Sequence, residues 1–357
     1  MPTPGSAAPE AAFFTFQHHP DQYSSWLGVR SLPKLNYRSH ELRRRMYAGE
    51  DAIFRRWLRP PFRADGWRVD VANMLGRQGA TQIGEEIARG IRQAVKETAP
   101  DSYLFGENFY DATRQLQGDQ WDGVMNYMGF GVPLLHWLRG LQLGAIGLRE
   151  AIQSPVPYTS AALEATWRLR RAAIPWAVLR QQYNLLGSHD TPRVGSQVNG
   201  NPALQRLAAT LLLTFPGVPG LYYGDEVGLM DLPGVRSRGC MPWDEAAWDR
   251  PLLAFYRKLI ALRRGSRILQ RGGFQVIALE TELLAYQREA PEGRILVVAQ
   301  RSATPRPAAV LDVTPAGIPD GARFVEFFGG ESATVQAGSI DLPELQQGAS
   351  IWIGEGE

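Results

Sequence analysis

The chain has 357 residues, of which 44% are hydrophobic and 21% are charged, and these proportions are typical of a globular protein with a sizeable core. Its 38 Lys and Arg residues nearly balance its 36 Asp and Glu residues, so no excess of charge indicates binding to nucleic acid or to an anionic membrane. No segment approaches the roughly 20 consecutive apolar residues that a membrane-spanning helix needs.

The chain opens with MPTPGSAAPEAAFF, which has neither the basic region nor the apolar region of a secretory signal. The single cysteine, Cys240, excludes an internal disulfide and argues against a structural zinc site. A lone cysteine also fits a reducing compartment. We therefore expect a cytoplasmic protein without a metal site.

Helical and strand patterns alternate along most of the chain, which predicts parallel βαβ units. The clearest helix spans 81–100, where apolar residues recur every four positions and Pro100 ends the pattern. Other helical patterns cover 41–58, 131–180, 202–215 and 252–269. The expected strands are GWRVDVAN (66–73), SYLFGENF (102–109), WDGVMNYMGF (121–130), YNLLGSHD (183–190) and GVPGLYYGDEVGL (217–229).

From about residue 272 the pattern changes to short strands separated by Gly, Pro and Asp turns. This predicts a small antiparallel β domain that begins near 268–272. The part before it lacks the G-x-G-x-x-G motif that a doubly wound dinucleotide-binding fold needs after its first strand. Polar residues instead follow several different strands, which is typical of the catalytic end of a (β/α) barrel. They are Asp70, Glu107, Asn126 and Asp190.

The strand GWRVDVAN places Arg68 and Asp70 on one face, because side chains alternate along a strand. A guanidinium beside a buried carboxylate favours its ionised form, which a nucleophile requires. A structural ion pair explains the motif R-x-D equally well. We expect both side chains to be buried in the barrel interior.

Two further strand ends favour a catalytic role over a structural one. LFGEN places Glu107 behind apolar residues, and an apolar surround favours the protonated form that a general acid needs. LLGSHD ends another strand with His189 and Asp190. One ionised and one protonated carboxyl group are the pair expected of a glycoside hydrolase.

GWRVDVAN, LFGEN and LLGSHD resemble three of the four short conserved blocks of the α-amylase superfamily, glycoside hydrolase family 13. LPKLN (32–36) resembles the block that marks the cyclomaltodextrinase, neopullulanase and maltogenic amylase group. GVPGLYYGDEVGL and CMPWD resemble the eighth barrel strand and the loop after it. The segment from YAGED to VANMLG (47–76) is similar to bacterial maltodextrin glucosidases. The resemblance runs from about residue 13 to the end.

The resemblance implies the C-terminal portion, about strands 4–8, of a (β/α)8 TIM barrel, followed by a small antiparallel β-sandwich. Residues 1–52 would be part of the loop after the third strand, 53–268 the C-terminal part of the catalytic barrel, and 269–357 the all-β domain. The family's first block, D-x-x-x-N-H, is not found, so we expect an N-terminally truncated chain. Five strands would leave two bare sheet edges, and we expect such a chain to be inactive and prone to aggregation.

Carried over by position, the resemblance makes Asp70 the nucleophile and Glu107 the general acid and base. Asp190 would hold substrate hydroxyls and stabilise the oxocarbenium-like transition state. Arg68 would orient Asp70, and His189 would bind hydroxyls of the sugar at subsite −1. The two main carboxyl groups should lie about 5–5.5 Å apart, as in a retaining enzyme.

Further positions carry weaker expectations. Asn73 and Phe109 correspond to contacts at subsite +1, although packing explains both nearly as well. The residues expected to support the scaffold and anchor loops are Tyr222, Tyr223, Asp225 and Glu226.

The function implied is retaining hydrolysis of α-1,4-glucosidic bonds in maltodextrins, as in a maltodextrin glucosidase. The alternative within the family is a cyclomaltodextrinase or maltogenic amylase with transglycosylation. The alternative of another class is a non-catalytic fragment that binds glucan or a partner chain.

No cofactor is expected. Some relatives bind calcium, but this sequence shows no set of ligands for it. The expected partner is a maltooligosaccharide substrate, and a homodimer is an assembly that the resemblance allows for the full-length form.

Overall fold

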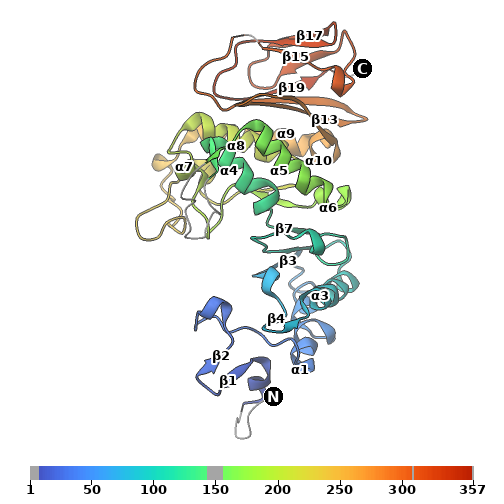
Figure 1. Ribbon diagram of the computed structural model, residues 1–357, viewed down its shortest axis with the longest axis vertical. Helices are drawn as coiled ribbons and strands as arrows, with labels where there is room; N and C mark the ends of the chain where they lie inside the picture. The colour runs from blue at the N-terminus through green and yellow to red at the C-terminus, as the bar shows by residue number, and fades with distance from the viewer. Residues whose placement is uncertain (1–7, 143–155, 308, 356–357) are drawn as a thin grey trace. The chain divides into compact units, whose positions relative to one another are not determined.

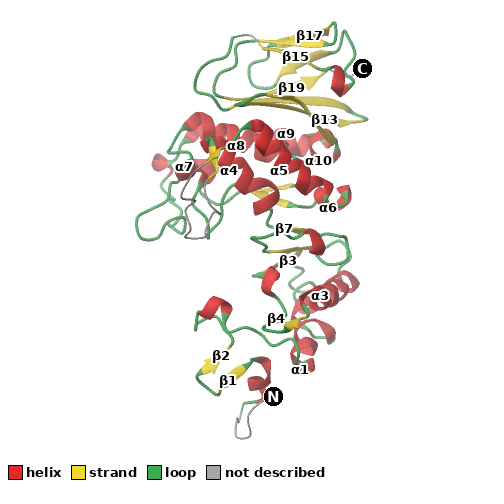
Figure 2. Cartoon of the chain, viewed as in Figure 1, coloured by secondary structure: helices red, strands yellow, loops and turns green. Residues whose placement is uncertain are grey.

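The computed structural model describes residues 8–142, 156–307 and 309–355, which form two compact units, Met1–Met125 and Asn126–Glu357 (Figures 1 and 2). Residues 1–7 and 143–155, which belong to the opening segment and to the predicted helical stretch 131–180, lie outside this description. Of the helices in the described ranges, none combines the length and the apolar character that crossing a membrane requires.

The first unit begins with short elements joined by loops. The expected helix over 41–58 is interrupted, because the chain passes through a π turn and then leaves helical geometry at Gly49. The buried side chains here include Leu42, Phe54 and Leu58, whereas Ile53 and Trp57 are both 42% exposed. The elements are η1 (Pro9–Phe13), β1 (Phe16–His18), β2 (Gln22–Tyr23), η2 (Trp26–Gly28), α1 (His40–Arg43), η3 (Arg44–Ala48) and α2 (Ile53–Arg56).

A three-stranded parallel sheet is the centre of the first unit. Its strands are β3 (Gly66–Val69), β6 (Tyr103–Gly106) and β7 (Gly123–Val124), in the order β3-β6-β7. Helix α3 (Gly84–Thr98) connects β3 to β6 and completely buries Ile87, Ile91 and Val95, which confirms the predicted amphipathic helix. The shorter elements are η4 (Ala72–Met74), β4 (Arg77–Gln78), β5 (Thr81–Gln82) and η5 (Thr113–Gln115).

Asp122, just before β7, ties α3 to this sheet. Its carboxylate accepts hydrogen bonds from Arg92 Nη1 (2.7 Å) and Lys96 Nζ (2.8 Å) of α3, and from the Leu104 backbone N–H (2.9 Å) of β6. Burial raises the pKa of Asp122, but the bonds from Lys96, Arg92 and Leu104 together outweigh burial and hold it below its usual range. Ionised Asp122 therefore stabilises the packing of the helix on the sheet.

The second unit contains helices, a short parallel sheet and the C-terminal strands. The predicted strand over 121–130 is limited to β7, because residues from Tyr127 onward turn into η6 and then α4. Strands β10 and β11 pair in parallel. The elements before the C-terminal strands are η6 (Tyr127–Gly131), α4 (Val132–Arg139), β8 (Leu141–Gln142), β9 (Val156–Pro157), α5 (Ser160–Ala172), α6 (Trp176–Leu179), β10 (Tyr183–Leu185), α7 (Val194–Gln197), α8 (Pro202–Thr214), β11 (Val218–Gly220), η7 (Asp225–Val227), η8 (Glu245–Ala247), α9 (Arg250–Gly265) and α10 (Arg267–Arg271).

An eight-stranded sheet follows from Gly273, in the order β12-β13-β14-β19-β16-β17-β18-β15. Every neighbouring pair in it is antiparallel, as predicted for this part of the chain. The strands are β12 (Gly273–Leu279), β13 (Leu283–Ala290), β14 (Gly293–Gln300), β15 (Ala309–Asp312), β16 (Arg323–Glu326), β17 (Ser332–Gln336), β18 (Ser339–Leu342) and β19 (Gly348–Gly354), with η9 (Thr314–Ala316) between β15 and β16.

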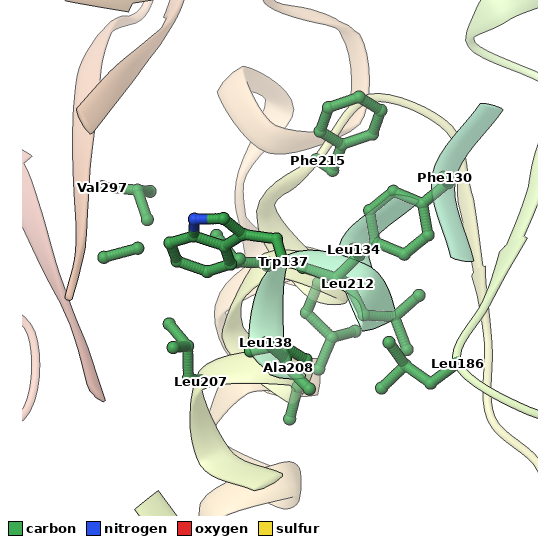
Figure 3. Close-up of a cluster of buried hydrophobic side chains, with 14 of the residues drawn as sticks. Phe130, Leu134, Trp137, Leu138, Leu186, Leu207, Ala208, Leu212, Phe215 and Val297 are labelled. Atoms are coloured by element: carbon green, nitrogen blue, oxygen red, sulfur yellow. The ribbon is translucent and has the colours of Figure 1, made fainter. Parts of the chain in front are cut away.

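Strands β13 and β14 are buried on both faces. Figure 3 shows Trp137 of α4 among Leu207 and Ala208 of α8, with Val297 of β14 beside it. The alternate residues on β14, Leu296 and Val298, belong to a second cluster inside the sheet. One face of these strands therefore packs on the helices, and the other forms the core of the sheet itself (Figure 1).

Two buried arginines cap the C-terminal end of α8, where the last carbonyls of a helix lack helical partners. Arg288 of β13 donates to Thr214 O (2.5 Å), Gly272 O (2.8 Å) and Gly273 O (2.8 Å). Arg263 of α9 donates to the carbonyls of Leu213, Phe215 and Gly217. Burial lowers the pKa of Arg288 to about 9, so the guanidinium keeps all its donors at neutral pH.

We predict that Asp122→Asn weakens the first unit in a pH-dependent manner. A lowered pKa contributes stability above the unfolded-state pKa of about 3.9, and this contribution is lost as pH falls through the folded-state pKa. At pH 7 the variant should lose about 2–4 kcal/mol, because two cations keep only a neutral partner. Hydrogen-exchange protection of 84–98 measures the loss. A difference from wild type that does not shrink toward pH 3 would contradict this assignment.

We also predict that Arg288→Met lowers the free energy of unfolding of the second unit by about 3 kcal/mol or more, because it leaves buried carbonyls without donors. Arg271→Met, at an exposed position in α10, two elements earlier, is the matched control and should change stability by less than about 0.5 kcal/mol. Urea denaturation of the two variants makes the comparison. Equal stabilities would show that the carbonyls do not depend on Arg288.

Candidate active site

The ends of two paired strands bring the first two predicted carboxylates together. Strands β3 and β6 are parallel, and Val69 pairs with Gly106. Asp70 and Glu107 are the next residues on each strand, so they occupy neighbouring positions at the same carboxyl end of the sheet. The Glu107 N–H donates to Val69 O (2.9 Å), which continues the ladder to this point.

The Arg68 guanidinium lies between these two carboxylates. Its Nη1 pairs with Asp70 Oδ1, and its Nη2 lies 2.9 Å from Glu107 Oε1. Met125 Sδ is 3.4 Å from the same Nη2. One cation thus contacts both predicted catalytic groups, which fixes their positions relative to each other.

The burial of the three side chains differs from the expectation in part. Arg68, which was expected to be buried, is half-buried, with 27% of its side chain exposed. Glu107 is buried, with 5% of its side chain exposed, as predicted. Asp70 was expected to be buried, but 75% of its side chain is exposed, because the chain turns at this residue instead of continuing the strand. The predicted apolar surround of Glu107 is also wrong, since Arg68 and the Val71 N–H contact its carboxylate.

Val71 is a functional position that the sequence analysis missed. Its backbone is left-handed (φ 43°, ψ 41°), a conformation that a β-branched residue rarely adopts. In this conformation its N–H donates to Glu107 Oε2 at 2.7 Å. No pattern in the sequence indicates such a conformation at a valine, because strain of this kind is imposed by the surrounding structure.

Gly106 is a second position that the sequence analysis missed. A Cβ there would meet Ala72 Cβ at 2.8 Å and Asn108 Oδ1 at 3.1 Å. Only glycine therefore fits before Glu107 without a shift of its neighbours. Of the predicted subsite residues, Asn73 lies in η4 after β3, and Phe109 lies in the loop after β6. Both are half-buried at this same end of the sheet.

His189 and Asp190 follow β10 in the second unit, at the strand end that the motif predicted, and they contact each other. His189 Nε2 lies 3.0 Å from Asp190 Oδ2. The other carboxylate oxygen, Oδ1, accepts a hydrogen bond from Arg238 Nη2 at 2.6 Å. Arg238 was missed because it lies 48 residues further along the chain.

Hydrogen bonds within the unit hold the backbone around Asp190. The Ser188 Oγ accepts from the Asp190 N–H (3.1 Å) and from Tyr127 Oη (2.9 Å). The Ser188 N–H donates to Thr191 Oγ1 (2.8 Å). Ser237 Oγ donates to the His189 carbonyl (3.2 Å), which connects this turn to the segment that carries Arg238.

Arg193 anchors the loop after β11. It is completely buried, and its Nη1 pairs with Asp225 Oδ1 at 3.0 Å while its guanidinium lies over the rings of Tyr222 and Tyr223. Burial raises the pKa of Asp225 to about 7, although Arg193 acts in the opposite direction. These contacts agree with the scaffold role expected of Asp225 and Tyr222.

The predicted residues therefore form two groups. Arg68, Asp70 and Glu107 meet in the unit Met1–Met125, and His189 and Asp190 meet in the unit Asn126–Glu357. Among the described residues, no cluster of three or more His, Cys, Asp or Glu side chains is arranged to hold a metal ion.

Comparison with known proteins decides the family. Residues 5–248 match the model of the alpha-amylase family, described as the alpha amylase catalytic domain. The chain belongs to the alpha-amylase family. Its catalytic domain thus precedes the antiparallel sheet that starts at Gly273.

Several curated relatives are named cyclomaltodextrinase, maltogenic amylase or neopullulanase. The chain is 34% identical over 294 residues to a cyclomaltodextrinase of Geobacillus thermopakistaniensis, a match that covers 81% of this chain and 45% of the relative. It is 29% identical over 330 residues to neopullulanase 2 of Thermoactinomyces vulgaris, a match that covers 91% of this chain and 50% of the relative. The chain thus spans about half the length of the curated relatives that it matches.

Several solved structures are similar to this chain in fold. Ttha1563 from Thermus thermophilus has a TM-score of 0.84 at 30% identity, covering 98% of this chain and 72% of that one. The debranching enzyme from Nostoc punctiforme has a TM-score of 0.81 at 26% identity, and the match covers 98% of this chain and 71% of that one. A cyclomaltodextrinase structure also has a TM-score of 0.81, at 26% identity, and the match covers 99% of this chain and 56% of that one.

The strain at Val71 leads to a stability prediction. Val71→Gly should change the free energy of unfolding by less than about 1 kcal/mol, because relief of about 1–3 kcal/mol of backbone strain offsets the lost contacts. Val69→Gly, two residues earlier in regular strand, should cost about 3 kcal/mol. Urea denaturation compares the variants. Equal losses at both positions would contradict the presence of strain at Val71.

Proposed function

We propose that this chain supplies the nucleophile and the general acid of a retaining glycoside hydrolase that cleaves α-1,4-glucosidic bonds in maltooligosaccharides. The observation that carries the proposal is the Arg68 guanidinium, which contacts both Asp70 and Glu107 at the carboxyl ends of two in-register parallel strands. Catalytic groups at the carboxyl ends of different strands are the usual arrangement in barrels of this family.

Asp70 and Glu107 have environments that suit different roles. Asp70 is the exposed member, so a sugar ring has access to it as a nucleophile. Glu107 is the buried member, and the Val71 N–H and Arg68 hold its carboxyl group in one orientation. A general acid needs this fixed orientation toward the leaving oxygen.

The reaction proceeds in two displacements. The Asp70 carboxylate attacks the anomeric carbon, the bond to the leaving oxygen breaks, and Glu107 donates a proton to that oxygen. Glu107 then takes a proton from water, and the water oxygen displaces Asp70, which restores the anomeric configuration. This sequence requires carboxyl groups about 5–5.5 Å apart, a separation that stays a prediction.

The remaining roles rest on the resemblance. We assign Asp190 to the stabilisation of the transition state, with Arg238 holding its carboxylate. His189 binds hydroxyls at subsite −1, and Asn73 and Phe109 contact the sugar at subsite +1. We also propose that the barrel part covers residues 53–268 and contains about strands 4–8 of the full barrel, with the all-β domain at 269–357.

The names of the relatives favour one further candidate within the same chemistry. Three curated relatives are named cyclomaltodextrinase, and one is named maltogenic alpha-amylase. We therefore include cyclic maltodextrins, and transglycosylation with them, beside the linear maltodextrins that the glucosidase resemblance indicates. Relatives named intracellular maltogenic amylase support a cytoplasmic location. A homodimer of the full-length protein stays a prediction.

Glucose and maltose release from maltotriose and from cyclomaltoheptaose, by the purified chain, tests the proposal. Glu107→Gln should reduce the rate by about 10²–10⁴-fold, because a general acid contributes that much. Asp70→Asn should abolish turnover, since the variant has no carboxylate to form the covalent intermediate. Asp65→Asn, an exposed position at the opposite end of β3, is the matched control and should retain the wild-type rate.

The same assay separates the hypotheses raised by the sequence. Turnover that Glu107→Gln and Asp70→Asn remove supports the hydrolase. Absence of turnover in the wild-type chain contradicts catalysis by this chain alone, as expected of a truncated barrel or of a non-catalytic fragment. Equal turnover in wild type and Glu107→Gln contradicts the role of Glu107. The ratio of rates on the linear and cyclic substrates decides between the two hydrolase candidates.

A further inference from the structure

Both ends of the segment 231–237 in the second unit are attached to Arg193 and to helix α7, which starts next to it. At the beginning of the segment, Asp231 Oδ1 accepts a hydrogen bond from the Arg193 N–H (3.1 Å), and the Asp231 N–H donates to Ser196 Oγ (2.8 Å). At its end, Arg193 Nη2 donates to Ser237 O (2.9 Å). One short stretch of chain therefore anchors the segment twice.

Ser237 connects Arg193 to both candidate residues that follow β10. Its carbonyl accepts the Arg193 bond, and its Oγ donates to His189 O (3.2 Å). The next residue, Arg238, donates to Asp190 Oδ1 (2.6 Å). Because 61% of the Arg238 side chain is exposed, its pair with Asp190 has little strength of its own, and its geometry depends on the backbone that carries it.

The Arg193 guanidinium is suited to hold this backbone, because it is completely buried and its donors have a fixed planar arrangement. Its Nη1 donates to Tyr223 O (2.5 Å) and pairs with Asp225 Oδ1 (3.0 Å), while Nη2 donates to Ser237 O. The ring of Tyr222 lies under it, 4.6 Å from its Cζ. A lysine ammonium is a single centre and does not span these three acceptors.

Asp225 is the charged partner of Arg193, and several titratable groups face it. Burial raises the pKa of Asp225 to about 7, Arg193 acts in the opposite direction, and Glu226 and Asp231 raise the pKa further. Tyr256 of α9 also interacts with it electrostatically. The pair with Arg193 is therefore fully ionised only above about pH 7.

We infer that Arg193 is a positioning residue for Asp190, which it fixes through Ser237 and Arg238. The buried guanidinium holds the backbone at Ser237, this backbone sets the direction of Arg238, and Arg238 holds the Asp190 carboxylate in one orientation. The catalytic importance of Asp190 rests on the proposed function, whereas the link from Arg193 to the segment rests on contacts within the second unit.

A nitroxide spin label on Cys240, the single cysteine of the chain and an exposed one, measures the motion of this segment without substrate. Arg193→Met should shorten the rotational correlation time of the label by about twofold or more, because the Ser237 and Tyr223 carbonyls lose a buried donor. Arg206→Met, at an exposed position of α8, is the matched control and should leave the label unchanged.

The pH profile of the same label distinguishes positioning by the ion pair from a general loss of structure. In the wild-type chain the label should become more mobile as pH falls through about 7, because protonation of Asp225 removes the negative charge that faces Arg193. In Asp225→Asn, which has nearly the same shape, this step should be absent. This variant also serves as the test if Arg193→Met does not fold.

An unchanged label in Arg193→Met, or a pH step near 7 that persists in Asp225→Asn, would overturn the inference. Where maltotriose is hydrolysed, Asp225→Asn should lower kcat by about tenfold with little change in KM, because Asp190 acts in the transition state. A rise in KM alone would contradict this role. Absence of hydrolysis counts against the proposed function, whereas the label tests the link from Arg193 independently, so the two failures are distinguishable.

Discussion

The parallel pairing of β3 with β6 is the constraint on which the candidate site depends. Since Val69 pairs with Gly106, the residues after them stand side by side, and a single guanidinium contacts both carboxylates. A shift of the register by one residue would turn one of the two side chains to the opposite face of the sheet. Glycine at position 106 allows this arrangement, because a side chain there would collide with Ala72.

Burial on both faces has a comparable role in the second unit. Strands β13 and β14 place alternate residues against the helices and against the interior of the eight-stranded sheet. Arg263 and Arg288 then satisfy carbonyls at the end of α8, so the helix cannot separate from β13 without exposing unpaired groups. Hydrophobic burial and backbone hydrogen bonding thus make the helices and the sheet one cooperative structure.

The failed expectations share a physical cause, which is local backbone geometry that periodicity does not report. The helix predicted over 41–58 is interrupted, because a π turn ends at Ala48 and the chain leaves helical geometry at Gly49. Asp70 was expected to be buried as part of a strand, yet the chain turns there and exposes it. The surround of Glu107 was misjudged because the neighbours along the chain are apolar, whereas those in space are Arg68 and the Val71 N–H.

Short motifs at strand ends were enough to predict the family, and the helical period predicted the amphipathic helix at 84–98. The same motifs selected the three carboxylates, whose catalytic roles stay a prediction. Tertiary structure alone decided which groups hold the carboxylates in place. Arg238 is distant in sequence from Asp190, and the left-handed backbone of Val71 is imposed by its surroundings. Local sequence encodes the reactive groups, whereas their orientation arises from contacts between residues that are far apart in the chain.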